Sequence, residues 1–300
     1  DGTAEMSLTM GGDISASPVA NQTVRFGSTT NNHKLNINLG GTNRIFTAAG
    51  SKSISFMNQI TNGTFTAFGA GIIKLSGPDG SALSIDAVSE QEGNLQCDSS
   101  TSGVNGTNRL KSITVRSGEL SAAGNSGADS VDSVSGSIII DRNFTNRTSS
   151  GRGGIGFITV DANASRNARL NANGLVRTNN AVVLVRGDTL GDTPASGFAN
   201  IFLTNAPTLT GGGGAAGTTN ISIIPWVFGG STPAATIQSF VTFDANGLRP
   251  LNTVTEYVTN ITDGSSSSAN VMLASGTTNT INSPTTVNAL FTAYSDSATT

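Results

Sequence analysis

The residues able to perform acid–base or metal chemistry are few in this chain. His33 is the single histidine among 300 residues, and Cys97 is the single cysteine. A Ser–His–Asp triad or a His-rich zinc site would depend on that one imidazole. His33 lies in a polar stretch typical of a turn, and the Gln and Asp beside Cys97 indicate a turn edge. One cysteine forms no intramolecular disulfide. The sequence indicates neither type of chemistry.

Closely spaced carboxylates are the second possible source of chemistry, because glycosidases use two of them across one sugar bond. The pairs in this sequence are Glu90 with Glu92, Asp129 with Asp132, and Asp188 with Asp192. Some parallel β-helices are pectin-cleaving enzymes, and a lyase would in addition need a basic residue beside a calcium cluster. The sequence has no such grouping. Solvated loop acids are therefore the favoured interpretation, and the chain is predicted not to be an enzyme.

Two Asp-x-Asn patterns contain oxygen ligands of the kind that Ca²⁺ prefers. One consists of Asp161 and Asn163, and the other of Asp244 and Asn246, which Gly247 follows. Neither completes an EF-hand loop, and the Gly-Gly-x-Gly-x-Asp calcium repeat is missing. Asx-turns, in which the side chain accepts a hydrogen bond from its own backbone, are the favoured alternative. We therefore expect no cofactor, with calcium as the one ion that these positions would suit.

Two short motifs have simpler structural interpretations. The tripeptide at 186–188, Arg-Gly-Asp, matches an integrin-binding motif but follows an apolar run, which favours a structural corner. Asn-x-Ser/Thr tripeptides are frequent, as expected by chance in a chain rich in Asn and Thr. If surface proteins of the source are glycosylated, Asn143 and Asn146 are the best candidate acceptors because they lie in a polar stretch.

The composition indicates strands and turns rather than a large compact core. Glycine is abundant, with 37 residues, while hydrophobic residues make up 36%, below the usual ~45–50%. Charged residues make up only 12%, and the net charge of −3 does not favour nucleic-acid binding. No run of about 18 apolar residues is present, so no membrane span is predicted. A first residue other than Met suggests a processed or excised segment, which fits export.

Short apolar-alternating segments recur along the chain, and most are bounded by Gly, Asn or Asp. Disordered tracts lack this alternation. Almost no helix is expected, and the best candidate for a short one is 284–293. The expected strands are 23–26, 34–39, 53–56, 64–68, 72–75, 82–85, 112–115, 137–140, 157–160, 168–171, 182–185, 200–203, 221–224, 239–243, 254–258, 271–273 and 287–291.

Several strand centres lie roughly 17 to 26 residues apart, near the lower end of solenoid repeat lengths. Examples are Ile54 with Ile73 and Ile139 with Ile158. In a right-handed parallel β-solenoid, or β-helix, each coil buries a few apolar side chains, and the neighbouring coils complete its hydrogen bonds. A β-sandwich or jelly roll also has strands every ~8–12 residues. The sequence predicts an all-β fold, with the solenoid favoured and the sandwich as the alternative.

The chain divides into three parts by character. Residues 1–20 form an N-terminal strand or extension that could contact another subunit, and 21–180 contain the solenoid-like repeats. Residues 181–300 form a C-terminal β region with more proline and longer loops, including a Gly-rich stretch at 211–217.

Three ordered segments in the C-terminal half resemble a known family. They are VVLVRGDTLG at 182–191, IIPWVFGG at 223–230 and FVTFDANGLRPL at 240–251. Together they are similar to bacterial surface passenger proteins with autotransporter-associated β-strand repeats. The resemblance covers about 157–260, under half of the chain, and implies a secreted, β-helical, structural or adhesive protein without catalytic residues. Members are usually very long and end in an anchor or a membrane barrel, and the 300 residues contain neither.

The sequence therefore predicts an extracellular, cell-surface structural or adhesive protein, with a carbohydrate-binding or polysaccharide-cleaving β-helix as the alternative. A strand-exchanging, pilin-like sandwich would serve the same structural role with another fold. Open strand edges invite pairing with another chain. We expect copies to join head to tail as a filament, with surface polysaccharide as a further possible partner. The intersubunit candidates are Met6, Leu8 and Met10, in the alternating stretch 3–10.

Overall fold

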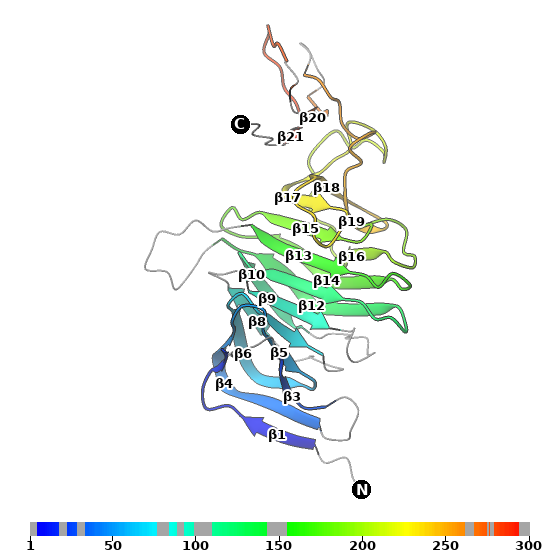
Figure 1. Cartoon of the computed structure of the whole chain (residues 1–300). Coiled ribbons are helices and arrows are strands. Elements are labelled where there is room, and N and C mark those ends of the chain that lie inside the picture. Colours follow the sequence, from blue (N-terminus) through cyan, green and yellow to red (C-terminus); the bar gives the residue numbers. More distant parts are fainter. Residues whose placement is uncertain are drawn as a thin grey trace, which may run out of the picture.

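The structure is a computed structural model that describes residues 5–17, 23–28, 34–76, 84–88, 93–98, 110–142, 155–261, 267–274, 276 and 279–293. These residues contain strands and no helix, which confirms the all-β prediction and excludes the short helix considered at 284–293. The strands form two large sheets and one small sheet. Figure 1 shows the strands stacked in layers, from β1 near the N-terminus to the hairpin and the small sheet near the C-terminus.

The first sheet begins near the N-terminus and pairs its strands in parallel. Its spatial order is β1 (Glu5–Thr9), β4 (Lys34–Ala48), β6 (Ile60–Phe68), β8 (Ser84–Val88), β10 (Ser112–Arg116), β12 (Ser130–Ile140), β14 (Ala168–Arg177) and β16 (Ala199–Leu203), with β2 (Ile14–Ala16) also pairing β4.

The second sheet is parallel from its first strand to β17 and ends in an antiparallel hairpin. Its spatial order is β3 (Thr23–Phe26), β5 (Ser53–Phe56), β7 (Ile72–Leu75), β9 (Asn94–Asp98), β11 (Glu119–Ala123), β13 (Gly156–Asp161), β15 (Val183–Gly187), β17 (Ile224–Gly230), β18 (Ser239–Asp244) and β19 (Gly247–Pro250). The third sheet contains β20 (Asn270–Ala274) and β21 (Ala289–Ala293), which are parallel.

Consecutive strands from β3 to β17 alternate between the two large sheets, so each strand from β5 to β15 pairs with the strands two places before and after it. Parallel neighbours need such a crossover, whereas the sheets of β-sandwiches and jelly rolls are antiparallel. Both sheets continue across residue 180 through β14–β16 and β13–β15. The division of the chain near that residue stays a prediction.

The core lies between the two sheets and is built from rows of aliphatic side chains. In the second sheet, one row runs from strand to strand in register through Val24, Ile54, Ile73, Leu95, Leu120, Ile158 and Val185. We call it the aliphatic row. Its members from Ile54 onward are at most 1% exposed. Each of these buried members is covered by the strands on both sides, so short strands with small apolar residues suffice to fill the space.

Four phenylalanines join the two sheets near the N-terminal end of this core. Phe46 and Phe65 come from the first sheet and have ring centroids 4.5 Å apart, and Phe56 from the second sheet lies 5.1 Å from Phe46. Phe26 stacks on Phe56 at 5.2 Å. Offset aromatic pairs of this kind contribute beyond their buried area, so they fasten the sheets where the stack begins.

The C-terminal end of the stack is closed. Val227, Val241 and Leu248 of β17, β18 and β19 are fully buried and complete the core. The backbone of Gly247 approaches the carbonyl of Ile201 so closely that any side chain at 247 would overlap it, and φ there is +95°. A second, smaller core then joins this hairpin to the third sheet through residues that include Phe240, Phe291, Leu251 and Tyr257.

Some local predictions were wrong. Residues 253–255 form a turn, and within the predicted strand 254–258 only Val258 pairs, in an isolated parallel bridge with Val271. Of the predicted strand 221–224, only Ile224 belongs to a strand, as the first residue of β17, while Ile221 and Ile223 form isolated bridges. Cys97 lies in β9 and is fully buried in the core, not at a turn edge. In the part of the chain that the structure describes, no helix is long and apolar enough to cross a membrane.

Candidate functional site

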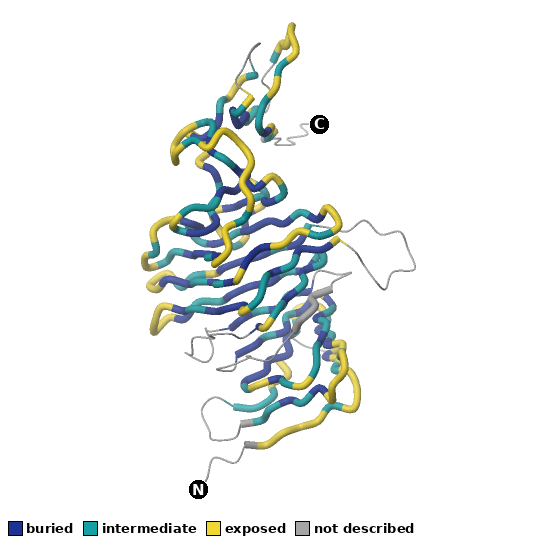
Figure 2. Tube along the Cα trace, turned by 180° about the vertical axis from the view of Figure 1, so that it is seen from behind, coloured by how far each residue is buried: buried dark blue, intermediate teal, exposed yellow. Residues whose placement is uncertain are grey.

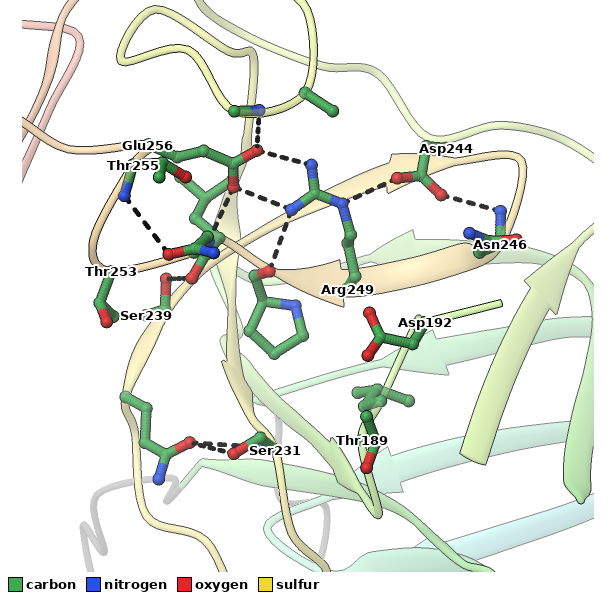
Figure 3. Close-up of a pocket in the computed structure, with 18 residues that line it drawn as sticks. Thr189, Asp192, Ser231, Ser239, Asp244, Asn246, Arg249, Thr253, Thr255 and Glu256 are labelled. Atoms are coloured by element: carbon green, nitrogen blue, oxygen red, sulfur yellow. Dashed lines mark hydrogen bonds and ion pairs between the residues drawn. The ribbon is translucent and has the colours of Figure 1, made fainter. Parts of the chain in front are cut away.

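An open pocket of about 810 Å³ lies beside the β18–β19 hairpin and is the best-defined candidate site (Figure 3). The hairpin supplies one wall, and the other walls are loops that follow β15, β16, β17 and β19. Most of the side chains that line it are polar. The labelled ones are Thr189, Asp192, Ser231, Ser239, Asp244, Asn246, Arg249, Thr253, Thr255 and Glu256.

Arg249 of β19 is held between two carboxylates at this pocket. Its Nη1 and Nη2 donate to Glu256 Oε2 and Oε1, each at 2.8 Å, and its Nε donates to Asp244 Oδ2 at 2.8 Å. A planar guanidinium matches a carboxylate in this bidentate manner. The Arg249 side chain is 14% exposed and that of Glu256 only 1%. The two form a nearly buried ion pair.

Backbone groups complete the hydrogen bonds of Glu256. Gly217 N donates to Oε1 at 2.8 Å, and Asn252 N donates to Oε2 at 2.7 Å. Burial alone would raise the pKa of Glu256, but the hydrogen bonds from Arg249 and from these two N–H groups outweigh it and hold the pKa below its usual value. The hydrogen bond to Glu256 is also the main reason why the pKa of Arg249 is raised. Both groups are therefore charged at neutral pH.

Tyr257 forms further hydrogen bonds in the same region. Its hydroxyl is 2.8 Å from Ser239 Oγ and accepts a hydrogen bond from Phe240 N at 2.9 Å. The residue is 4% exposed, and burial raises the pKa of the phenol. Ser239 Oγ also contacts the Leu251 carbonyl at 3.0 Å. The start of β18 is thereby joined to the segment that follows β19.

The pocket can offer hydrogen bonds to a polar ligand. The Asp244 and Glu256 carboxylates are committed to Arg249 and to backbone N–H groups, including Asn246 N, which donates to Asp244 Oδ1 at 2.8 Å. A general acid needs a carboxyl with a raised pKa, and Glu256 has a lowered one. The exposed Asp192 and neutral groups such as Asn246 and Ser231 are the remaining polar side chains facing the pocket.

Both candidate calcium turns form the backbone hydrogen bonds of Asx-turns. Asp244 Oδ1 accepts from Asn246 N, and Asn163 Oδ1 accepts from Ser165 N at 3.1 Å. Asp161 is exposed at the end of β13, and its pKa is raised by partial burial and by the nearby charge of Asp188. Calcium binding at these turns stays a prediction. Among the described residues, no three His, Cys, Asp or Glu side chains gather into a metal-binding group.

The described carboxylate pairs have separate structural partners. Asp129 Oδ1 accepts from Asn167 N at 3.0 Å, whereas Asp132 is buried within β12. Asp188 Oδ2 accepts from Ala162 N at 2.9 Å, and Asp192 lies at the pocket. Among the described hydrogen bonds, none is shared by the two carboxylates of either pair.

The Arg-Gly-Asp tripeptide begins in strand β15, not in a free loop. Arg186 lies on the outer face of the second sheet, where its Nη2 is 3.0 Å from Glu119 Oε1 and its Nε donates to Thr159 Oγ1 at 2.9 Å. Its guanidinium also lies 4.8 Å from the ring centroid of Phe157. Asn94 Nδ2 continues this row by donating to Glu119 Oε2 at 2.8 Å. These contacts link four adjacent strands.

Several candidate residues lie outside the described part of the chain. They are His33, Glu90, Glu92, Asn143 and Asn146. The intersubunit candidates are described: Met6 and Leu8 lie on β1, and Met10 follows it and packs against the core. Strand β1 pairs with β4 of its own chain.

Compared with protein-family models, curated proteins and solved structures, the chain has no match. The Arg249–Glu256 pair was missed by sequence reasoning, although Arg249 lies in the quoted segment 240–251. The only available signal was one arginine and one glutamate seven positions apart, at either end of a Pro- and Asn-containing stretch. That pattern is too common to identify an ion pair.

Proposed function

We propose that this chain is an extracellular structural protein with an adhesive role at the cell surface, and that its copies assemble into a filament. The single observation that supports this most is the parallel backbone pairing that runs through the first sheet and through the second sheet as far as β17, and whose N-terminal edges no other described strand covers. Such an architecture can be extended by adding further layers at its edge, which suits an elongated structural protein. We assign no catalytic role to the chain.

The fold that we propose is a right-handed parallel β-solenoid. The alternation of consecutive strands between two facing sheets supports it, because one strand from each sheet and the two connections between them make one coil. Right-handed crossovers are the general rule for parallel strands. The stacked aliphatic row supports it further, since each coil then adds one member to a continuous core.

The proposed surface location is supported by composition and by the resemblance of residues 157–260 to bacterial passenger proteins. The chain has few charged residues and many Thr, Ser and Asn residues, which suit a hydrated β surface. The ion pairs at Arg249 and Arg186 fix loops and strands to one another. Their arrangement supports a structural rather than a catalytic use of these charges.

Electron microscopy and sedimentation of the purified chain test this proposal. We expect particles that lengthen as the protein concentration rises, and a spacing of about 4.8 Å along their axis by fibre diffraction. Monomers that stay monodisperse at all concentrations would refute self-assembly. Cell fractionation of the source organism tests the location, and recovery of the protein with cytosolic markers would contradict it.

A carbohydrate-binding module is the second candidate function, and the polar pocket at Arg249 is the observation that favours it. Sugar hydroxyls would find donors and acceptors in Asp192, Asn246 and Ser231. Binding of surface polysaccharide fragments by calorimetry, compared between the wild type and Asp192→Ala, tests this reading. Equal heats for both proteins would contradict it.

A further inference from the structure

The N-terminal end of the stack consists of strand edges that no other described strand covers. In the first sheet β1 pairs only with β4, and in the second sheet β3 pairs only with β5. Met10 N donates to Asn38 O of β4 at 2.8 Å. Because alternate residues of a parallel strand bond to the same neighbour, the N–H groups of Ser7 and Thr9 point away from β4.

Some core-facing side chains of the described residues are also exposed at this end. Met6 and Leu8 pair with Leu35 and Ile37, on the side of the sheet that faces the core. Ile37 is 1% exposed, but Met6 is 50% and Leu8 is 42% exposed. Figure 2 shows this strand as an exposed segment near the N-terminus. These apolar side chains belong to the core rows but lack the next layer.

The second sheet ends in the same way. Val24 begins the aliphatic row and is 40% exposed, whereas its partner Ile54 is fully buried. Among the described residues, both sheets therefore end in exposed apolar side chains that belong to core rows. Burial of such a surface is favoured in water.

The opposite end of the stack offers no matching surface on the large sheets. The β18–β19 hairpin closes the core there, and Gly247 lies against the backbone of β16 at Ile201. Pro250 ends the outermost strand and has no N–H to donate.

The third sheet provides the other parallel edge. Strand β21 pairs only with β20 among the described residues, and Leu290 on it is 46% exposed. Asn288 Nδ2 donates to Asn270 Oδ1 at 2.7 Å, and Asn270 Nδ2 donates to Ile221 O at 2.8 Å. This asparagine ladder shows that stacking of parallel layers resumes beyond the hairpin. Figure 1 places β20 and β21 at the end of the molecule opposite β1.

Neither strand has a sequence feature that prevents pairing with another chain. Natural edge strands are protected by Lys, Pro, bulges or covering segments. The sequence of β1 is Glu-Met-Ser-Leu-Thr and that of β21 is Ala-Leu-Phe-Thr-Ala, so neither contains Lys or Pro. Strands β20 and β21 contain no charged residue.

We propose that β21 of one copy pairs in parallel with the outer edge of β1 of the next copy. The strand order across the junction is β20, β21, and then β1 and β4 of the neighbour, and all four strands are parallel. The junction covers Met6 and Leu8. The contact joins two different surfaces, so it can repeat from one copy to the next, and it produces a filament where the rotation between copies does not close a ring. This inference rests on the proposed self-assembly and identifies the surfaces that would perform it.

Two variants that each block one end test the junction. Leu8→Lys places a charge on the open core at β1, and Leu290→Lys places one on β21. We expect each variant alone to remain monomeric in sedimentation velocity, and an equimolar mixture to form dimers and nothing longer. In that mixture one intact β21 and one intact β1 remain. Val254→Lys is the matched control, because Val254 is 85% exposed in a turn outside both edges, and it should assemble like the wild type.

Ser7→Pro gives a second block at β1 that introduces no charge, because it removes only an N–H pointing away from β4. At least one of the two β1 variants, Leu8→Lys or Ser7→Pro, should keep the strand content of the wild type by circular dichroism. That folded variant should also be monomeric. Assembly of either end-blocked variant alone, or a purely monomeric mixture, would overturn the junction while filaments of the wild type still supported the proposed function. A wild type that never assembles would refute both.

Discussion

Replacement of Arg249 by methionine is expected to destabilise the C-terminal end of the stack strongly. The change removes a cation that donates to both oxygens of Glu256 and to Asp244. Glu256, whose side chain is 1% exposed, would keep only the N–H groups of Gly217 and Asn252. Removing one partner of a buried pair costs about 3–5 kcal/mol, against about 0–1 kcal/mol for an exposed pair.

The lower part of that range, about 3 kcal/mol, is the expected loss because two backbone donors remain on Glu256 and the pocket admits water. Urea unfolding followed by the fluorescence of Trp226, the single tryptophan, measures the loss near β17. Amide hydrogen exchange at Gly217 and Asn252 reports on the same region. Arg166→Met is the control, because Arg166 is exposed, and it should cost less than about 0.5 kcal/mol.

The pH dependence provides an independent check. The folded-state pKa of Glu256 lies below its unfolded value. Its contribution to stability is therefore complete above the unfolded pKa, which is about 4.3, and is lost as the pH falls through the folded pKa. The difference between the wild type and Arg249→Met should shrink over that window. A loss below about 1 kcal/mol at neutral pH, with unchanged amide exchange, would refute the reasoning.

Three further outcomes are expected. Val185→Ala should lower the free energy of unfolding by about 2 kcal/mol because two buried carbons are lost, and Val24→Ala, at the exposed end of the same row, should lower it by about half as much. Equal losses in urea titrations would contradict the description of Val24 as an exposed end of the row. Gly187→Ala should cost about 1–3 kcal/mol, because the added Cβ would lie 2.6 Å from Val160 O and 2.8 Å from Ala199 Cβ, and an unchanged melting temperature would exclude that crowding. Tyr257→Phe should cost about 1–3 kcal/mol by leaving Phe240 N and Ser239 Oγ without the phenol, measured by thermal unfolding, and faster exchange of the Phe240 amide should accompany it.

The sequence was most informative where strands are rich in β-branched or aromatic residues. The predicted strands 23–26, 53–56 and 72–75 match β3, β5 and β7 at both ends. The strands β9 and β11 were missed because Asn-Leu-Gln-Cys-Asp and Glu-Leu-Ser-Ala-Ala have low strand propensity. They form strands because the layers on both sides supply hydrogen bonds and a core.

The predicted strand at 254–258 failed for a local reason. Val254 and Thr255 donate their N–H groups to Asn252 Oδ1, and Asn252 N donates to Glu256. A side chain that accepts backbone hydrogen bonds competes with strand pairing. The same contacts explain why the pocket was not predicted, because the ion pair with Arg249 depends on a turn that propensity alone assigns to a strand.

The direction of the hydrogen bonds between strands determines how this molecule would respond to a pulling force. These bonds run along the stack, so tension between the two ends loads the layers in series, one after another. The force at which the stack begins to open is then set by its weakest layer, not by the average strength of the layers. Among the described residues, strands β1, β3 and β21 have a neighbour on one side only, so a free copy would peel from its end layers while the aromatic cluster of Phe46 and Phe56 behind β1 and β3 holds. A second copy paired with such an end layer would strengthen that layer and raise the force at which the filament begins to open.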